Sequence, residues 1–259
     1  MTGTEPKFDI RLARDEADIL SAQRLRYAVF VEELGGDGAL VDHVNRLERD
    51  EFDPFFDHLI LVDRKRSARA LDHVVGVYRV MRSDQAQAMG RFYSEDEYDL
   101  TPLKASGRKL LELGRSCLYP DYRGGTAMFH MWNTLAGYVL RHRVEIMFGV
   151  ASFHGIRPDC FAESLSYLHH THMAPPDLRV RAADAGFQRM DLMPADAVDR
   201  KRAMAAMPSL IKAYLRLGGF VGEGAFIDRA FNTTDVCLLM DTERLNPRQR
   251  ALYVQGRSG

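Results

Sequence analysis

The stretch LLELGRSCLY, residues 110–119, constrains the fold of this chain most, because it places an acid and an arginine inside an apolar run of strand length. A buried charged pair lowers stability unless each charge is matched or used. On a regular strand Glu112 and Arg115 would point to opposite faces, since they are three residues apart. Gly114 lies between them, and a glycine inside a strand often marks a bulge that brings such side chains onto one face. We therefore predict a bulged strand, with an ordinary core salt bridge as the alternative.

The segment PDYRGG, residues 120–125, follows this strand and precedes an apolar-striped helix predicted over residues 125–143. Backbone N–H groups at a helix start, glycines and Arg123 together form a cradle for phosphate oxygens. The sequence contains no GxxxxGK[ST] and no GxGxxG motif, so it does not favour a mononucleotide- or dinucleotide-binding site. A glycine turn with a solvated arginine is the alternative interpretation.

Hydrophobic periodicity predicts a mixed α/β fold. Residues 15–34 form a helix in this interpretation, and residues 58–63 and 74–83 form an antiparallel hairpin joined by a polar turn. The region near 84–107 has no clear period and is predicted to be an irregular insertion. Further strands are expected at 8–13, 145–152, 220–228 and 235–241, and further helices at 157–172 and 208–217.

Charge and cysteine content exclude several function classes. The 35 basic and 36 acidic residues create no overall field that would attract nucleic acid. The three cysteines are far apart without a CxxC pair, which argues against a disulfide framework and a zinc site and favours a reducing cytoplasm. The sequence contains no run of about 18 apolar residues, so no membrane-spanning helix is predicted. The basic tail over residues 241–259 is either solvated or in peripheral contact with anionic lipid of the inner membrane.

The segment RLERDEFDPFFD, residues 46–57, clusters the carboxylates Glu48, Asp50 and Asp53 among aromatic residues. Carboxylates this close repel one another unless cations meet them. The available cations are Arg26, Arg79 and Arg115, and a network of these groups could hold the amino group of a substrate. A solvated acidic loop is the alternative, and a metal site is disfavoured because no known ligand spacing is present.

Ser152 and His154 follow directly after the predicted buried strand 145–152, where they could line a cleft. They lack the GxSxG elbow of serine hydrolases, so covalent serine chemistry is not expected. His154 remains an alternative general base. The HHTH segment, residues 169–172, is expected to interact with a helix dipole or with solvent.

The segments RLRYAVF, ERDEFD, YRVMR and ELGRSCL, in this order, resemble the acyl-homoserine-lactone synthases, which have the GNAT acyltransferase fold. The match places Arg26, Phe30, Glu48, Asp50, Asp53, Arg79, Glu112 and Arg115 on the functional positions of that family. The downstream segments YRGG, GVASFHG and PSLIKAYLRLGGFVGEGAFIDRAFNTTDVCLLM are similar to the haemolysin-related N-acyltransferases that make lyso-ornithine lipid. The tryptophan expected after RxxVF in the lactone synthases is absent, which favours a simple amide product.

The resemblance implies a single GNAT-like domain over residues 1–259, with a mixed, mostly antiparallel central sheet, a splayed or bulged strand, and flanking helices. It also implies transfer of a 3-hydroxyacyl group from acyl carrier protein to the α-amino group of ornithine, in the first step of ornithine lipid synthesis. Alternatives are glutamine or another amino acid as acceptor, a lactone-forming synthase, and a non-catalytic module that binds acyl carrier protein or lipid.

The roles that follow from this resemblance are expectations for named residues. Glu112 accepts the proton of the amine, and the N–H groups near Ser116 and Cys117 polarise the thioester carbonyl. Glu48 and Phe30 belong to the substrate-binding surface, with Phe30 shaping the acyl tunnel. The acceptor side is ordered by Arg26, Asp50, Asp53, Arg79 and Arg115, and the phosphopantetheine is held by Tyr122, Arg123, Gly124 and Gly125.

No tightly bound cofactor is expected, because the acyl group arrives on the 4'-phosphopantetheine of acyl carrier protein. That partner is acidic and needs a basic landing surface near the entrance for its arm. Arg123, Arg141 and Arg143 are the candidates for this surface.

Overall fold

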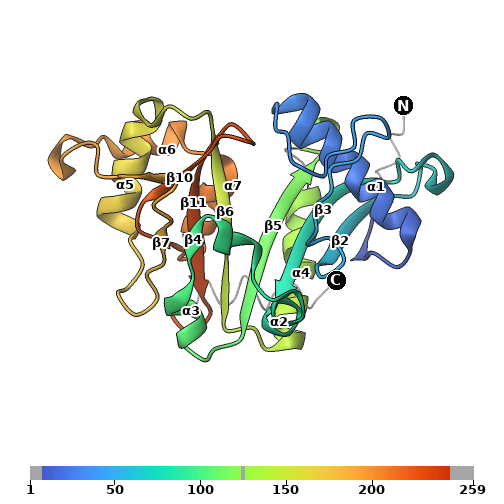
Figure 1. Ribbon diagram of the computed structural model, residues 1–259, viewed down its shortest axis with the longest axis horizontal. Coiled ribbons are helices and arrows are strands. Elements are labelled where there is room, and N and C mark those ends of the chain that lie inside the picture. Colours follow the sequence, from blue (N-terminus) through green and yellow to red (C-terminus); the bar gives the residue numbers. More distant parts are fainter. Residues whose placement is uncertain (1–7, 124–125, 246–259) are drawn as a thin grey trace. The chain divides into compact units, whose positions relative to one another are not determined.

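The structure is a computed structural model that describes residues 8–123 and 126–245 (Figure 1). Internal contacts divide the chain into two compact units. Of the described residues, the first unit comprises 8–81, 113–123 and 126–142, and the second comprises 82–112 and 143–245. The single domain over residues 1–259 stays a prediction.

The sheet of the first unit contains strands β1 (Phe8–Leu12), β2 (Asp57–Asp63) and β3 (Val74–Arg82), followed in strand order by β5 (Leu110–Leu118) (Figure 1). β1 pairs with β2, and β2 pairs with β3, in antiparallel register. The β2–β3 hairpin agrees with the sequence-based prediction. Its register shifts between Leu61 and Val62.

Two helices pack against the sheet of the first unit. Helix α1 (Glu16–Arg26) begins after Asp15, whose side chain accepts a hydrogen bond from the backbone N–H of Asp18. Its residues Ala22 and Leu25 share a core cluster with Ile60 and Val62 of β2. Helix α4 (Ala127–His142) contributes Met131, Leu135 and Val139 to the buried side chains.

Helix α4 packs closely against the sheet at Gly76 of β3, because glycine has no Cβ atom. A Cβ atom at this position would lie 2.4 Å from Leu118 Cδ2 and 3.0 Å from Met131 Sδ. Leu61, which alternates with the core residues Ile60 and Val62 along β2, lies beside the same position. The face opposite α1 is therefore the one that receives Met131 of α4.

The helix predicted over residues 15–34 changes its hydrogen-bond pattern after Arg26. Residues Tyr27–Glu33 form a seven-residue π-helix, η1, whose last turn is closed by a bond from Leu34 N to Val29 O. π-helical segments are rare and occur frequently at functional sites. Helix α1 therefore ends, and η1 begins, directly after Arg26, which is predicted to order the acceptor side of the site.

The second unit contains the start of β5 and a set of strands that follow it in the order β6, β11, β10, β8. Leu110–Glu112 of β5 pair in parallel with Ile146–Phe148 of β6. β6 pairs with β11 in antiparallel register over its whole length, from His154↔Thr233 to Ile146↔Asp241. The strands of this unit are β6 (Ile146–His154), β8 (Phe187–Gln188), β9 (Phe220–Val221), β10 (Ala225–Asp228) and β11 (Thr233–Asp241), with β4 (Tyr98–Asp99) and β7 (Arg181–Ala182) forming a separate pair.

The helices of the second unit differ from the predictions in three places. The region near 84–107, expected to be irregular, contains three short helices and β4, and a helix over residues 200–206 has no counterpart in the sequence analysis. The short helix η6 (Ala195–Ala197) was not predicted either, and the remaining helices agree with the predicted positions within a few residues. The helices are α2 (Ser83–Met89), η3 (Tyr93–Asp96), α3 (Thr101–Ala105), η5 (Pro158–Phe161), α5 (Ala162–His172), η6 (Ala195–Ala197), α6 (Arg200–Ala206) and α7 (Ser209–Arg216).

The predicted fold class is confirmed as a mixed α/β fold with mostly antiparallel pairing, one parallel pair and flanking helices. The irregularity predicted at Gly114 of β5 lies at the next residue, Arg115, whose φ of 51° is left-handed. A left-handed residue inside a strand is typical of a bulge and is costly for a residue with a Cβ.

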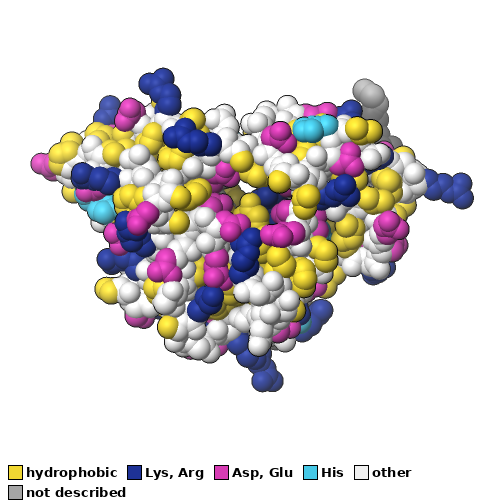
Figure 2. Space-filling view, in the orientation of Figure 1, with side chains coloured by type: hydrophobic (Ala, Val, Ile, Leu, Met, Phe, Trp, Pro, Cys, Tyr) yellow, Lys and Arg dark blue, Asp and Glu magenta, His cyan; other side chains and the backbone are white. Residues whose placement is uncertain are grey.

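Acidic and basic side chains are interspersed on the face shown in Figure 2. This mixture agrees with the near-balance of 35 basic and 36 acidic residues in the sequence. Among residues 8–123 and 126–245, none of the helices has both the length and the apolar content needed to span a bilayer.

Candidate functional site

Arg26 lies at the last position of α1 and is fully buried, at 0% exposure. Its Nε donates to Glu48 Oε2, and its Nη1 donates to Asp53 Oδ1 at 2.6 Å. Nη2 donates to Asp53 Oδ2 at 3.1 Å and to the carbonyl oxygen of Glu48 at 2.8 Å. A buried guanidinium is stabilised when its donors are satisfied in this way, and here all three nitrogens have acceptors.

Arg79, in the middle of β3, is the second fully buried cation of this group. Its Nη1 donates to Asp50 Oδ1 and to Asp53 Oδ1, both at 2.7 Å. The guanidinium carbon lies 4.5 Å from the centre of the Phe56 ring, a distance that allows a cation–π contact. The sequence analysis placed Arg79 in mid-strand, and the structure brings it to the predicted carboxylates.

Arg115 completes the group from β5, where its backbone is left-handed within the strand. Its Nε donates to Glu48 Oε1 at 3.1 Å, and its Nη2 lies 3.7 Å from Asp50 Oδ2. The guanidinium carbon lies 5.9 Å from the centre of the Phe30 ring on η1. The predicted residues Arg26, Glu48, Asp50, Asp53, Arg79, Arg115 and Phe30 are thus brought together in the first unit.

We call the six charged members the arginine–carboxylate network: Arg26, Arg79, Arg115, Glu48, Asp50 and Asp53. Burial alone would raise the pKa of each carboxyl, but the neighbouring arginines outweigh burial and hold all three pKa values below their ordinary range. Burial would likewise lower the pKa of Arg26, and the adjacent carboxylates raise it instead. The network therefore holds three cations and three anions at neutral pH, and its formal charge is zero.

The two aspartates of the network differ in how their oxygens are used. Asp53 Oδ1 accepts from Arg26 and Arg79, and Asp53 Oδ2 accepts from Arg26 and from Gln23 Nε2 at 3.0 Å. Each carboxylate oxygen accepts about two hydrogen bonds, so Asp53 is saturated. Asp50 Oδ1 accepts from Arg79 and from the backbone N–H of Phe52 at 3.0 Å.

The second oxygen of Asp50 is the exception. Asp50 Oδ2 is buried and accepts no hydrogen bond from the residues that the structure describes. Arg115 Nη2, at 3.7 Å, supplies charge without a hydrogen bond. This oxygen therefore keeps acceptor capacity that the described residues do not use.

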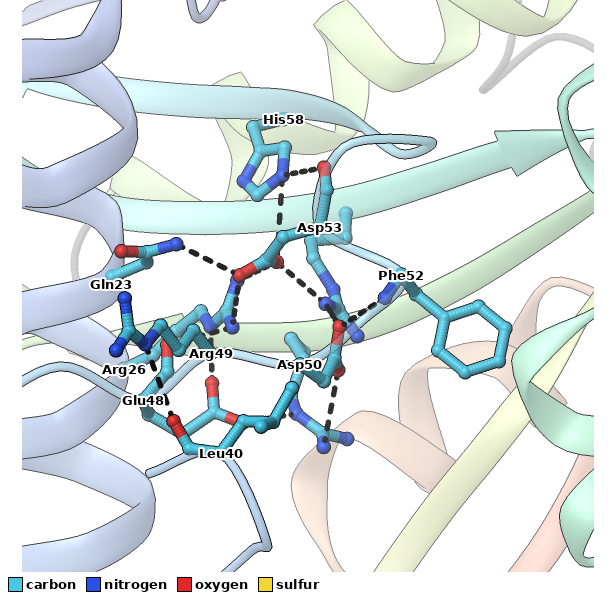
Figure 3. Close-up of polar contacts among 11 residues, drawn as sticks. Gln23, Arg26, Leu40, Glu48, Arg49, Asp50, Phe52, Asp53 and His58 are labelled. Carbon is cyan, nitrogen blue, oxygen red and sulfur yellow. Dashed lines mark hydrogen bonds and ion pairs between the residues drawn. The ribbon is translucent and has the colours of Figure 1, made fainter. Parts of the chain in front are cut away.

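His58 and Gln23 belong to the same cluster, and the sequence analysis missed both. His58, on β2, is buried, and Figure 3 shows it beside Asp53: its Nε2 lies 3.2 Å from the Asp53 carbonyl oxygen. Burial and the neighbouring Arg26 lower the pKa of His58 to about 4, so the ring is neutral at pH 7. Two signals were available in the sequence. His58 directly follows the acidic segment, and Gln23 lies one helical turn before Arg26.

Glu112, the proposed base, lies on β5 in the second unit and is 1% exposed. Its Oε2 accepts from the backbone N–H of Tyr93 at 2.8 Å, and its Oε1 accepts from the N–H of Ser94 at 2.6 Å. The Ser94 hydroxyl also donates to Oε1. These three donors fix the orientation of the carboxylate at the start of η3.

The other predicted substrate-binding residues occupy β5 and β6. Ser116 is half-buried, and Cys117 is buried in the core cluster beside α1. Burial raises the pKa of Cys117 to about 12, so its side chain remains a thiol and is no thiolate nucleophile. In the second unit, Ser152 is half-buried at its pairing position with Asp235, and His154 is exposed at the end of β6.

The predicted phosphopantetheine residues have partners of their own. The Tyr122 hydroxyl donates to Asp63 Oδ2 at 2.6 Å and accepts from Arg66 Nε at 3.2 Å. Arg123 binds Glu33 through both terminal nitrogens, at 2.6 Å each. Gly124 and Gly125 lie outside the described residues.

Three carboxylates in the second unit have the spacing of a possible metal site. One oxygen each of Glu97, Asp228 and Asp235 lie within 4.8 Å of one another. Asp235 Oδ2 accepts a hydrogen bond from the hydroxyl of Thr233 at 3.0 Å. Acidic groups at this spacing also occur without an ion, and the sequence analysis expected no metal.

Comparison with known proteins gives consistent matches. Residues 25–133 match the family model for an acetyltransferase (GNAT) domain. The chain is 60% identical over 260 residues to an L-ornithine N(alpha)-acyltransferase of Rhodobacter capsulatus, covering 99% of this chain and 100% of that protein. It is 44% identical to an L-ornithine N(alpha)-acyltransferase of Brucella abortus, covering 95% of this chain and 88% of that protein.

Solved structures agree on the fold. The crystal structure of the AHL synthase LasI aligns with a TM-score of 0.52 at 13% sequence identity, covering 97% of this chain and 96% of that one. This similarity supports the GNAT-like fold and, at this identity, nothing finer. Taken with the full-length relatives, the matches show that the chain is an acyltransferase and belongs to the family of the L-ornithine N(alpha)-acyltransferases.

Proposed function

We propose that this acyltransferase joins a 3-hydroxyacyl group to the α-amino group of ornithine, and that the acyl donor is a thioester on the phosphopantetheine of acyl carrier protein. The amine nitrogen attacks the thioester carbonyl, a C–N bond forms and the C–S bond breaks. The amine loses a proton, and the thiol of the donor leaves carrying one. The product is lyso-ornithine lipid.

The names of the full-length relatives support ornithine as the acceptor. The observation in this chain that carries the proposal is Asp50 Oδ2, the buried oxygen of the arginine–carboxylate network that accepts no hydrogen bond from the described residues. An ammonium or amine N–H group is a suitable donor for it. Asp53, by contrast, is saturated, so we assign amine binding to Asp50 and support of Arg26 and Arg79 to Asp53.

The neutrality of the network bears on specificity. Three arginines balance three carboxylates, so the network offers no excess negative charge to a diamino acid. Recognition here therefore depends on one directed hydrogen bond at Asp50 and not on net charge. We expect the α-amino acid end of the acceptor to bind here.

Glu112 is the proposed proton acceptor. A carboxylate held by two backbone N–H groups and a hydroxyl keeps a fixed direction, as general base catalysis requires. Glu112→Gln is expected to abolish turnover, and Ser94→Ala, which removes one donor and leaves the carboxylate, is the matched control with a small loss. Full turnover by Glu112→Gln would remove Glu112 as the base and leave His154 as the alternative.

One assay tests the proposal. The full chain is incubated with a 3-hydroxyacyl carrier protein and, separately, ornithine, lysine, glutamine or S-adenosylmethionine, and products are identified by mass spectrometry. We expect an N-acylated ornithine. A lactone from S-adenosylmethionine would support a lactone-forming synthase, and tight carrier binding without turnover of any acceptor would support a non-catalytic module.

A further inference from the structure

Each of the three nitrogens of the Arg123 guanidinium donates a hydrogen bond within the first unit. Its Nε donates to the carbonyl oxygen of Leu118 at 3.0 Å. Its Nη1 and Nη2 donate to Glu33 Oε1 and Oε2, at 2.6 Å each. The carboxylate of Glu33 thus takes the two terminal nitrogens in the bidentate arrangement that arginine forms with carboxylates and phosphates alike.

This geometry bears on the predicted role of Arg123 as a phosphate ligand. A phosphate presents two oxygens to a guanidinium in the same way as a carboxylate does. Since Leu118 uses the Nε edge, a phosphate that binds Arg123 in bidentate fashion has to take the nitrogens that Glu33 now occupies. The two anions compete for one edge of one cation.

The pair is placed so that exchange is easy. The side chains of Arg123 and Glu33 are 41% and 37% exposed. Water and salt screen an ion pair at this level of exposure and weaken the attraction between its two charges. The phosphodiester of a carrier-bound donor has two free oxygens and one negative charge, so it can replace the Glu33 carboxylate on Arg123 while Glu33 turns into solvent.

Glu33 is the last residue of the π-helix η1, which also carries Phe30 beneath Arg115. Its neighbour Glu32 forms an equivalent contact elsewhere, with Arg46 Nη2 at 2.6 Å. Adjacent residues of one segment thus hold two different arginines, and one of these arginines belongs to the segment assigned to the donor. Glu32 is therefore a matched control for substitutions at Glu33.

We propose that Glu33 is an internal competitor for the phosphate of the acyl donor, which occupies the bidentate edge of Arg123 until the donor's phosphopantetheine phosphate displaces it. This inference rests on the proposed function, since it requires a donor that carries a phosphate. Glu33 then sets the affinity for the donor and takes no part in the chemical step.

The test uses two small donors in place of the carrier: S-(3-hydroxyacyl)-4'-phosphopantetheine and the same thioester of pantetheine, which lacks the phosphate. Steady-state kinetics of the full chain are measured with saturating ornithine. Glu33→Gln is expected to lower KM for the phosphorylated donor about two- to fivefold, the change that corresponds to a half-exposed ion pair. The kcat value, and the KM for the donor without phosphate, are expected to stay within error.

Two further variants complete the design. Glu32→Gln removes the neighbouring carboxylate and is expected to leave both donors unaffected. Arg123→Gln is expected to erase the preference for the phosphorylated donor, and adding Glu33→Gln to it is expected to change nothing more, because the competed cation is gone.

The inference is overturned if Glu33→Gln changes KM equally for both donors, or raises it for the phosphorylated one. Either result would mean that the Arg123–Glu33 ion pair only stabilises the structure. It is also overturned if Glu32→Gln has the same effect as Glu33→Gln. Failure of the wild-type chain to acylate ornithine with either donor, or with the carrier-bound donor, would instead contradict the proposed function.

Discussion

The first unit contains two buried ionic clusters, and they differ in one respect that separates structure from function. In the arginine–carboxylate network, Asp50 keeps one buried oxygen without a hydrogen bond from the described residues. In the second cluster, around Asp18 of α1, both carboxylate oxygens are filled. The saturated cluster fastens a helix, and the unsaturated one keeps the acceptor to which we assign the substrate amine.

Asp18 shows what a purely structural carboxylate looks like in this fold. It accepts from both terminal nitrogens of Arg11, from the backbone N–H of Arg14 at 2.8 Å and from His73 Nε2 at 2.9 Å. Burial would raise the pKa of Asp18, and the hydrogen bonds from Arg11 and His73 hold it well below its ordinary range. Asp53 resembles Asp18 in its saturation, and this resemblance argues that Asp53 supports the network while Asp50 serves the substrate.

The largest expected effect comes from removing the cation of each cluster. Arg26→Met leaves Glu48 and Asp53 buried without their main partner, and we expect a loss of about 3–5 kcal/mol in the free energy of unfolding. Arg11→Met leaves Asp18 with two other donors, and Arg11 is partly exposed, so about 1 kcal/mol is expected. Urea unfolding of both variants measures the difference. Equal losses would contradict the distinction between the clusters.

Sequence reasoning identified all six members of the arginine–carboxylate network because their types and order are distinctive. It missed Gln23 and His58, because their positions near the acidic segment and near Arg26 do not by themselves show which atoms they contact. His58 reaches the network through its cross-strand position opposite Arg79. The pairing of His58 with Arg79 depends on the register between β2 and β3, which the sequence does not specify.

The backbone irregularities were harder to place. A bulge was expected at Gly114, since glycine adopts positive φ without strain, yet Arg115 takes the left-handed conformation. Its ties to Glu48 and Asp50 compensate for the strain, and such tertiary contacts lie outside local propensity. Likewise, a seven-residue π-helix cannot be told from an α-helix by apolar spacing over so short a segment.

The second prediction tests the open oxygen directly. Asp50→Asn keeps the shape of the side chain but replaces a charged acceptor with a neutral amide, and we expect kcat/KM for ornithine to fall about 100-fold. Asp18→Asn is the matched substitution in the saturated cluster, where activity is expected to change less than about twofold while stability decreases. Steady-state kinetics and thermal unfolding of both variants measure the two effects. A comparable loss of activity in Asp18→Asn would remove the special role of Asp50.

The smallest effect concerns pH and His58. The folded state holds the pKa of His58 at about 4, below its ordinary value of 6.5, so the unfolded chain binds this proton more readily. The contribution of His58 to stability is therefore complete above pH 6.5 and is lost as the pH falls from 6.5 towards 4. We expect about 2 kcal/mol of this loss between pH 7 and pH 5.

His58→Gln isolates the pH-dependent contribution of His58 to stability, because glutamine can still donate to the Asp53 carbonyl oxygen and does not titrate. The variant is expected to be less stable than the wild type at pH 7, since a buried contact is perturbed, yet to lose about 2 kcal/mol less between pH 7 and pH 5. The network carboxylates and Asp18, whose pKa values are lowered, lose their contributions at more acidic pH and do not interfere. Parallel pH profiles for the two proteins would show that folding does not lower the pKa of His58. The ring would then be protonated at pH 5 in the folded state, and the network would carry a fourth cation that its three carboxylates do not balance.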